Sequence, residues 1–303
     1  MWNQFIGMTK RNILVFLKDK MAIFFSLLAP IIIMFLYIVF LKNTYMNSIN
    51  DSIKALEGII DPNDIESFSN SWLLSGVLGT SCVTISLNSL SIMVEDKERK
   101  IDYDYNASPI KGSVVILSYF FGALINTLLI TLTILTIGLS VLSLMGNMYL
   151  NFTDVLFLYF ILILGCASST MLMMIIVSFF KKGTSFSAFS GIVSAAIGFL
   201  IGAYVPVGSL AVGVQNFASI VPGAHIASIL RNTLMGGILD KINSDINGLD
   251  QGAFYEAMHK EFALNLKFFG YELNVLTMIL YVIIMIFVCF LINFVLYKRT
   301  SKH

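Results

Sequence analysis

The densest group of charged side chains lies between Glu95 and Gly112, in the sequence EDKERKIDYDYNASPIKG. Carboxylates, amines and a guanidinium this close together can form charged contacts with another protein, which is the chemistry of a docking surface. One or two helical turns are predicted before Ser108-Pro109, because proline disfavours helix in the preceding residue and donates no hydrogen bond itself. The alternative is a solvated loop whose charges only keep it in water.

Catalytic constellations are nearly absent from the chain. His225, His259 and His303 lie far apart, and neither HExxH nor GxSxG occurs, so an intramembrane hydrolase is disfavoured. A membrane-bound enzyme would have only His225, Arg231 and His259 to use. No GxxxxGK[ST] occurs either, so we expect no ATP hydrolysis by the usual phosphate loop and no bound cofactor. The three cysteines show no CxxC or Cys/His spacing, which predicts neither a disulfide nor a metal site.

A second polar set lies within an apolar run and repeats at steps of four, four, four and three, which places it on one face of a helix. Its members are Gly76, Thr80, Thr84, Asn88 and Ser91. A polar stripe inside a membrane must face protein or water. It therefore serves either hydrogen bonding between helices or a substrate path.

Long apolar helices must position these residues. The chain of 303 residues is 57% hydrophobic and only 12% charged, with a mean hydropathy of +0.84, which indicates an all-α integral membrane protein. Its net charge of +1 gives no support for a nucleic-acid partner. Residues 1–20 predict an interfacial amphipathic helix, although a solvated basic leader is the alternative. Six spans are predicted over 21–41, 71–94, 113–144, 155–180, 186–205 and 275–296.

The region 206–274 is apolar at first but is interrupted by Pro206, Pro222 and several glycines, so it fits no clean span. Irregular backbone at membrane depth is tolerated only when it is buried in protein or lines a cavity, which predicts a re-entrant helical hairpin. With His225 and Arg231, the two prolines are candidate residues of an external gate. A polar loop is predicted over 240–250, and a four-residue ladder then predicts an amphipathic helix through Phe254, Met258, Phe262 and Leu266.

The distribution of charge gives an orientation for these spans. Both termini, residues 95–112 and the Lys181-Lys182 pair fall on one side and carry 13 of the 19 basic residues but only 6 of the 18 acids. That side has a net charge of +7 and the other side −6. By the positive-inside rule both termini are cytoplasmic.

The order of these segments resembles the permease of type-2 ABC exporters, the family that moves drugs, lipids, peptides and polysaccharides out of bacteria. Two stretches carry the resemblance locally. EDKERK followed by ASPIKGS is similar to the family's Glu-Arg pair and Ser-Pro before the third span, and RNILVFLKDKMAIFFSLLAP resembles its first span and the segment before it. Lys100 and Ile101 stand where many members have Gly-Thr.

The resemblance implies a half-transporter in the bacterial plasma membrane, paired with a second copy or a sibling permease and surrounded by lipid. A separate cytoplasmic ABC ATPase would bind ATP and Mg and dock on the charged segment. The docking residues are then Glu95, Glu98, Arg99, Lys100, Asp104, Ser108 and Pro109. A passive channel or a membrane scaffold without an ATPase partner is the alternative.

Overall fold

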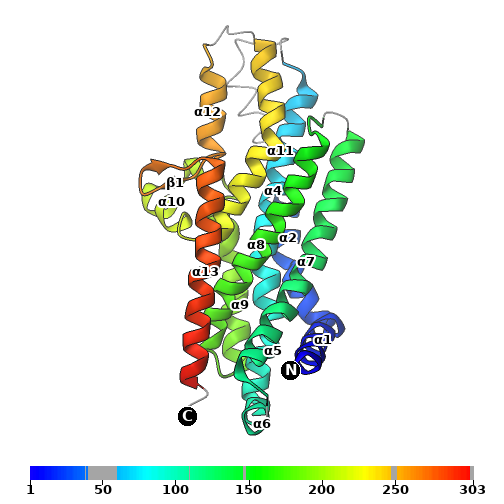
Figure 1. Ribbon diagram of the computed structural model, residues 1–303. Helices are drawn as coiled ribbons and strands as arrows, with labels where there is room; N and C mark the ends of the chain where they lie inside the picture. The colour runs from blue at the N-terminus through cyan, green and yellow to red at the C-terminus, as the bar shows by residue number, and fades with distance from the viewer. Residues whose placement is uncertain (38, 40–59, 109, 146–147, 247–250, 301–303) are drawn as a thin grey trace.

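The computed structural model is an elongated helical bundle (Figure 1). It describes residues 1–37, 39, 60–108, 110–145, 148–246 and 251–300. Its helices and strands are α1 (Trp2–Lys18), α2 (Lys20–Leu36), α4 (Pro62–Ser89), α5 (Ser91–Glu98), α6 (Ile101–Ala107), α7 (Gly112–Met145), α8 (Phe152–Ser178), α9 (Gly183–Ile201), the 3-10 turn η3 (Val207–Ser209), α10 (Val212–Ala218), α11 (Pro222–Ile246), α12 (Ala253–Glu261), β1 (Lys267–Phe268), β2 (Tyr271–Glu272) and α13 (Val275–Thr300).

Helix α4 is the centre of the bundle and packs against α2, α7, α8, α9 and α11. In the segment Pro62–Glu98, 89% of the most apolar window is buried, against 17% for α13. Small and hydroxyl side chains allow this close packing, as at Gly76, where an added Cβ would lie 2.8 Å from the Cβ of Ala203. The stripe-bearing helix is therefore surrounded by protein rather than by lipid.

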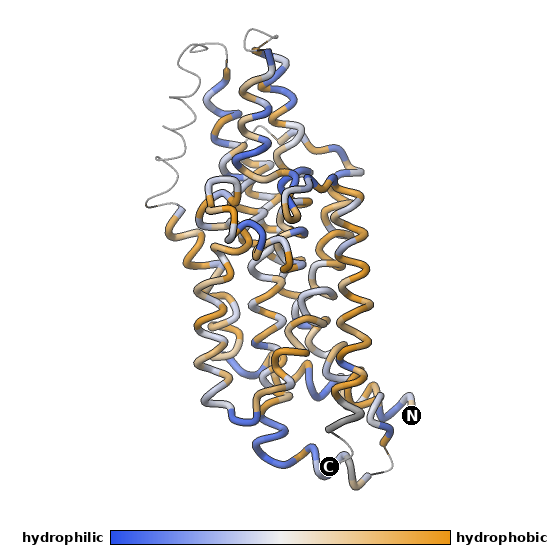
Figure 2. Tube along the Cα trace, turned by 90° about the vertical axis from the view of Figure 1, so that its left-hand side faces the viewer, coloured by the Kyte–Doolittle hydropathy of each residue, from blue (hydrophilic) through white to orange (hydrophobic). Residues whose placement is uncertain are grey.

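Long apolar helices enclose α4 on the outside. Five helices of the described chain are long and apolar enough to cross a membrane, and a sixth counts if α1 and α2, bent by 72°, are one span. Hydrophobic residues cover the middle of the molecule and hydrophilic residues collect near its two ends (Figure 2). This is a multi-pass membrane protein with five to six candidate spans. The predicted first span continues into positions 38, 40 and 41, which lie outside the described residues.

Helix α4 begins at Pro62, nine residues before the predicted start of the second span. Asp61 accepts a hydrogen bond from the Asn63 N–H at 2.9 Å, and proline at the first helical position has no N–H that needs a partner. The added turns pack Ile65 and Phe68 into the buried cluster that α4 shares with α11 and α12. A cap and tertiary packing therefore determine where the helix starts. The acidic residues of this segment are typical of a loop, and hydropathy alone did not predict the early start.

Helix α11 corrects one expectation for the region 206–274. It runs through Gly236 and Gly237 and on to Ile246, so the polar loop predicted over 240–250 is wrong up to that residue. Gly237 is needed for contact, since an added Cβ would lie 2.5 Å from the Tyr149 carbonyl oxygen. Buried Leu239 and Ile242 hold the helix against α4, and this packing outweighs the low helix propensity of glycine.

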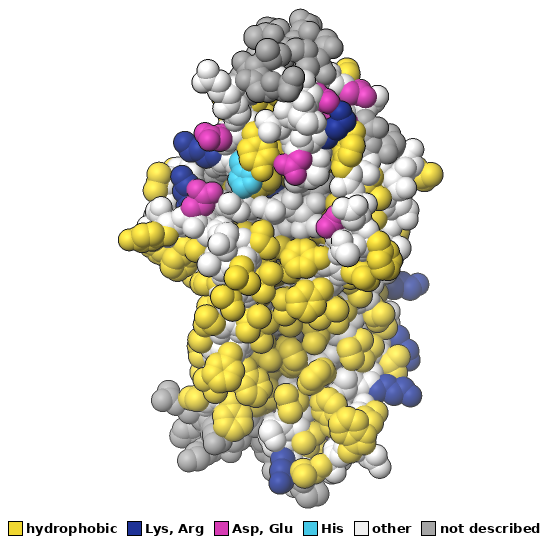
Figure 3. Space-filling view, turned by 45° about the horizontal axis from the view of Figure 1, so that its top comes forward, with side chains coloured by type: hydrophobic (Ala, Val, Ile, Leu, Met, Phe, Trp, Pro, Cys, Tyr) yellow, Lys and Arg dark blue, Asp and Glu magenta, His cyan; other side chains and the backbone are white. Residues whose placement is uncertain are grey.

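The predicted helix after position 250 is shorter than its apolar ladder. Phe254, Met258, Phe262 and Leu266 are all buried, but α12 ends at Glu261. A short antiparallel hairpin follows, with Lys267 opposite Glu272 and Phe268 opposite Tyr271. In Figure 3, acidic and basic side chains gather over this end, above a belt of hydrophobic side chains. We call it the outer end, after the orientation that the charge distribution predicts.

Candidate functional site

The charged segment forms two short helices at one end of the bundle. Helix α5 continues α4 after a break at Leu90, and α6 protrudes beyond the other helices at that end (Figure 1). Lys100 turns the chain between α5 and α6 in the left-handed conformation, with φ of 60°. The one to two helical turns expected before Ser108 correspond to α6, which ends at Ala107.

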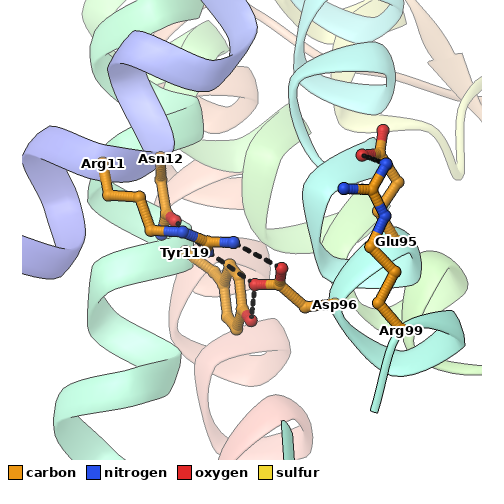
Figure 4. A network of polar contacts seen from close by, with 6 residues as sticks. All are labelled: Arg11, Asn12, Glu95, Asp96, Arg99 and Tyr119. Atoms are coloured by element: carbon orange, nitrogen blue, oxygen red, sulfur yellow. Dashed lines mark hydrogen bonds and ion pairs between the residues drawn. The ribbon is translucent and has the colours of Figure 1, made fainter. Parts of the chain in front are cut away.

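Buried Asp96 joins three elements at this end (Figure 4). Its carboxylate accepts hydrogen bonds from Arg11 Nη1 and Nη2 at 2.7 and 2.6 Å, and from the Tyr119 hydroxyl at 2.6 Å. Hydrogen bonding to Asp96 raises the pKa of the Arg11 guanidinium above its ordinary value, against the opposing effect of burial. The bidentate pair ties α1 to α5, and the Tyr119 hydrogen bond ties α7 to α5. Sequence reasoning missed both contacts.

The other charges of α5 divide into inward and outward groups. Lys97 Nζ donates to the Ser178 carbonyl at the end of α8 at 2.6 Å, and Glu98 accepts from the Gly183 N–H at the start of α9 at 2.9 Å. Glu95 and Arg99 form an exposed ion pair at 3.9 Å. The end of α8 and the start of α9 are therefore both held against α5.

The remaining predicted docking residues lie on the α6 side. Lys100 and Asp104 are exposed, and the Ser108 hydroxyl donates to the Tyr105 carbonyl at 2.8 Å. Pro109 lies outside the described residues. Together with Arg99, the exposed charges give the protruding end a polar surface.

The polar stripe of α4 divides into two parts. Gly76 packs on Ala203, the Thr80 hydroxyl bonds within its own helix to the Gly76 carbonyl at 2.9 Å, and the Thr84 hydroxyl donates to the Ser26 carbonyl of α2 at 3.1 Å. Asn88 and Ser91 instead line a cavity. Gly76, Thr80 and Thr84 therefore serve helix packing and helix hydrogen bonds, whereas Asn88 and Ser91 border a cavity.

That cavity, of about 370 Å³, lies between α2, the α4–α5 junction and α9. We call it the inner cavity; its lining is Asp19, Met21, Ala22, Phe25, Leu28, Ala29, Ile32, Asn88, Ser91, Glu95, Gly183, Phe186, Ser187, Ser190, Gly191, Ser194 and Ala195. The α2 wall is apolar, and the α9 wall carries serine hydroxyls. Sequence reasoning did not identify Asp19 or the serines of α9 as lining residues.

Packed apolar side chains close the bundle beyond the inner cavity. Ile33, Val77, Ala203 and Tyr204 form one buried cluster between α2, α4 and the end of α9. The Tyr204 ring also lies against Gly198, where an added Cβ would be 2.3 Å from it. We call this cluster the apolar plug.

The four predicted gate residues hold the outer region together. Pro206 precedes η3, and Pro222 begins α11. His225 is buried, contacts the Ser219 carbonyl through Nε2 at 2.6 Å and stacks on Tyr281.

Arg231 is fully buried behind the end of α9. Its Nη2 donates to the carbonyls of Ile201 and Gly202 at 2.5 and 2.9 Å, where Gly202 ends the helix with φ of 75°. A cation beside terminal carbonyls is favourable because the C-terminal end of a helix carries partial negative charge. Arg231 therefore fixes the outer end of α9 to α11.

A second cavity, of about 420 Å³, lies in the outer region between η3, α10, α12 and the hairpin. His259 lines it beside Glu256 and Glu272, and burial lowers the pKa of His259 below its ordinary value. His225 and Arg231 do not line it, so it does not bring together the three residues considered for an enzyme. Within the described residues, no three His, Cys, Asp or Glu side chains are grouped as a metal would require.

Comparison with known proteins agrees with this architecture. Residues 61–295 match the family described as ABC-2 family transporter protein, which covers most of the chain. A search of curated proteins finds no match. The matched segment includes the central helix, both helices of the charged end, α9 and the outer region. The chain belongs to the ABC-2 family of transporter proteins and is a transport subunit without a catalytic domain.

Proposed function

We propose that the protein is the permease half of an ATP-driven exporter, powered by a separate ABC ATPase that binds ATP and Mg. ABC-2 permeases generally pair with such an ATPase. The protruding α5–α6 end offers exposed charges for docking at Arg99, Lys100 and Asp104. By the charge rule this end and both termini are cytoplasmic. The family resemblance implies the plasma membrane of a bacterium.

The observation that carries this proposal is the position of α5. On one side it continues into the protruding α6, and on the other its Ser91 and Glu95 line the inner cavity. A force applied to α6 would reach a wall of the cavity through the single turn at Lys100. The Asp96 and Glu98 contacts would carry the same displacement to α1, α7 and α9.

The inner cavity is the proposed substrate path. A second permease copy or a sibling permease is proposed to close its open side. Three elements border the cavity, and its lining residues Phe25, Ser187 and Ala195 remain exposed. A path on the axis between two copies would be completed by this face of each. With the apolar plug intact, that path is open at the cytoplasmic end and closed toward the outside.

The test is capture of the ATPase by the exposed charges of the α5–α6 end. We expect a co-expressed ABC ATPase to co-purify with the wild-type chain and to be lost from the Arg99→Glu/Asp104→Lys variant. Lys267→Glu, a charge change at the opposite end, is the matched control and should retain the ATPase. Equal recovery with the docking variant would refute docking at these charges. Failure of the wild-type chain to retain any ATPase would favour a channel or scaffold, and ATP hydrolysis by the purified chain alone would refute the proposal.

A further inference from the structure

We propose that the cargo is an amphiphile that carries a positive charge. This inference rests on the proposed function of the inner cavity as the substrate path. It concerns the chemistry of the cavity lining, which combines two carboxylates with an apolar wall and a hydroxyl wall.

The charge of the lining has one sign. Asp19 and Glu95 are its charged members, and among the described residues no Lys, Arg or His lines the cavity. The N–H groups of Met21 and Ala22 both bond to Asp19 Oδ1, at 2.9 and 3.0 Å, and Oδ2 accepts no hydrogen bond from the described residues. The Glu95 partner Arg99 is exposed and 3.9 Å away, so it neutralises Glu95 only weakly.

The neighbouring helix start does not reverse this sign. The N-terminus of α9 would add partial positive charge at Gly183, but Glu98 accepts the Gly183 N–H at 2.9 Å and offsets it. Carboxylates are therefore what a cargo meets at the cytoplasmic end of the cavity. A phosphate-rich or otherwise anionic cargo would find no basic side chain among the described lining residues.

The walls fit the rest of an amphiphile. Phe25, Leu28 and Ile32 of α2 present apolar surface, while Ser190 donates to the Asn88 side-chain oxygen at 2.8 Å. The Asn88 amide also donates to the Thr84 carbonyl, so these polar groups are already satisfied by protein. Such a wall does not require the cargo to supply hydrogen bonds in fixed directions. It therefore suits a cargo with an apolar body and one charged group.

Two ions of matched shape and opposite charge test the proposal without any ATPase. We would measure binding of tetraphenylphosphonium and of tetraphenylborate to the purified full-length chain in detergent, by equilibrium dialysis. The phosphonium should bind more tightly. Glu95→Gln and Asp19→Asn should each raise its Kd about fivefold. Asparagine also caps helices, so the second change removes charge with little effect on α2. Glu261→Gln, which removes an exposed carboxylate from α12, is the control.

Filling the cavity separates failure of this inference from failure of the proposed path. Ala195→Phe, at an exposed lining position where folding is not at risk, should weaken binding of both ions. If Ala195→Phe weakens both ions but the charge variants change nothing, the cargo class is refuted and the path stands. Phosphonium binding that is insensitive to Ala195→Phe would refute the path as well. Equal or tighter binding of the borate by the wild-type chain would refute the positive charge of the cargo.

Discussion

The single residue Lys100 decides the shape of the charged end. Its φ of 60° is a conformation that an L residue with a Cβ adopts at a cost and that glycine adopts freely. A Gly-Thr pair, which the resemblance implies at this position, would fit the same turn. We expect Lys100→Gly to raise the free energy of unfolding by about 0.5 kcal/mol, measured by thermal unfolding of the purified protein. Lys100→Ala keeps a Cβ in the left-handed conformation and should not raise the free energy of unfolding. If it raised that free energy as much as Lys100→Gly does, the effect would come from loss of the lysine charge.

The ion pair between Arg11 and Asp96 should contribute more to the free energy of unfolding than the conformation of Lys100 does. Arg11→Gln leaves a buried carboxylate without its cation and should lower the free energy of unfolding by about 3 kcal/mol. Tyr119→Phe removes one hydrogen bond and should cost about 1.5 kcal/mol. The double variant Arg11→Gln/Asp96→Asn should be more stable than Arg11→Gln, because no unpaired charge remains. A double variant less stable than the single one would contradict this account.

Sequence alone did not reveal that pair. Arg11 and Asp96 are 85 positions apart, and each lies among other charges of both signs. The amphipathic pattern of 1–20 predicted a helix, and buried Thr9, Asn12 and Phe16 on α1 are compatible with it. It did not predict which basic side chain faces protein, because that choice depends on how α1 crosses α7. A long-range ion pair is a property of packing rather than of local pattern.

At the scale of elements, the apolar runs predicted helices in the positions of α7, α8, α9 and α13. The apolar runs did not predict the ends of a helix where contacts with other helices determine those ends. Helix α4 starts earlier than its apolar run because it packs on α11, and α11 continues past Gly237 because that glycine meets Tyr149. Hydropathy reports how much apolar surface a segment carries, but not which polar turns another helix will cover.

The divided stripe of α4 gives a prediction about the same element. After replacement of the three native cysteines by alanine, Ser91→Cys should react with a thiol reagent supplied from the cytoplasmic side in inside-out vesicles. Thr80→Cys and Thr84→Cys should not react, because these buried positions contact other helices. Ser187→Cys, on the opposite wall, is the positive control. Reaction at Thr84→Cys as fast as at Ser91→Cys would favour a path along the whole stripe.

At the scale of the whole molecule, α9 connects the two ends. Its Ser187 and Ser190 line the inner cavity, Glu98 holds its first N–H, and Arg231 holds its last carbonyls. The chain then leads into η3, which packs against both α9 and α12. A movement of α9 driven from the cytoplasmic end would therefore displace part of the outer region.

This connection predicts that the outer region behaves as a lid. Ser209→Cys, at an exposed position of η3, should react with an impermeant thiol reagent added outside cells, at a rate that changes when the ATPase is trapped with nucleotide. Ser244→Cys, exposed on the distal part of α11, should react from outside at an unchanged rate, because that part packs on α4 rather than on α9. Reaction of Ser209→Cys only after permeabilisation would refute the orientation, and an unchanged rate would refute the lid while leaving the orientation intact.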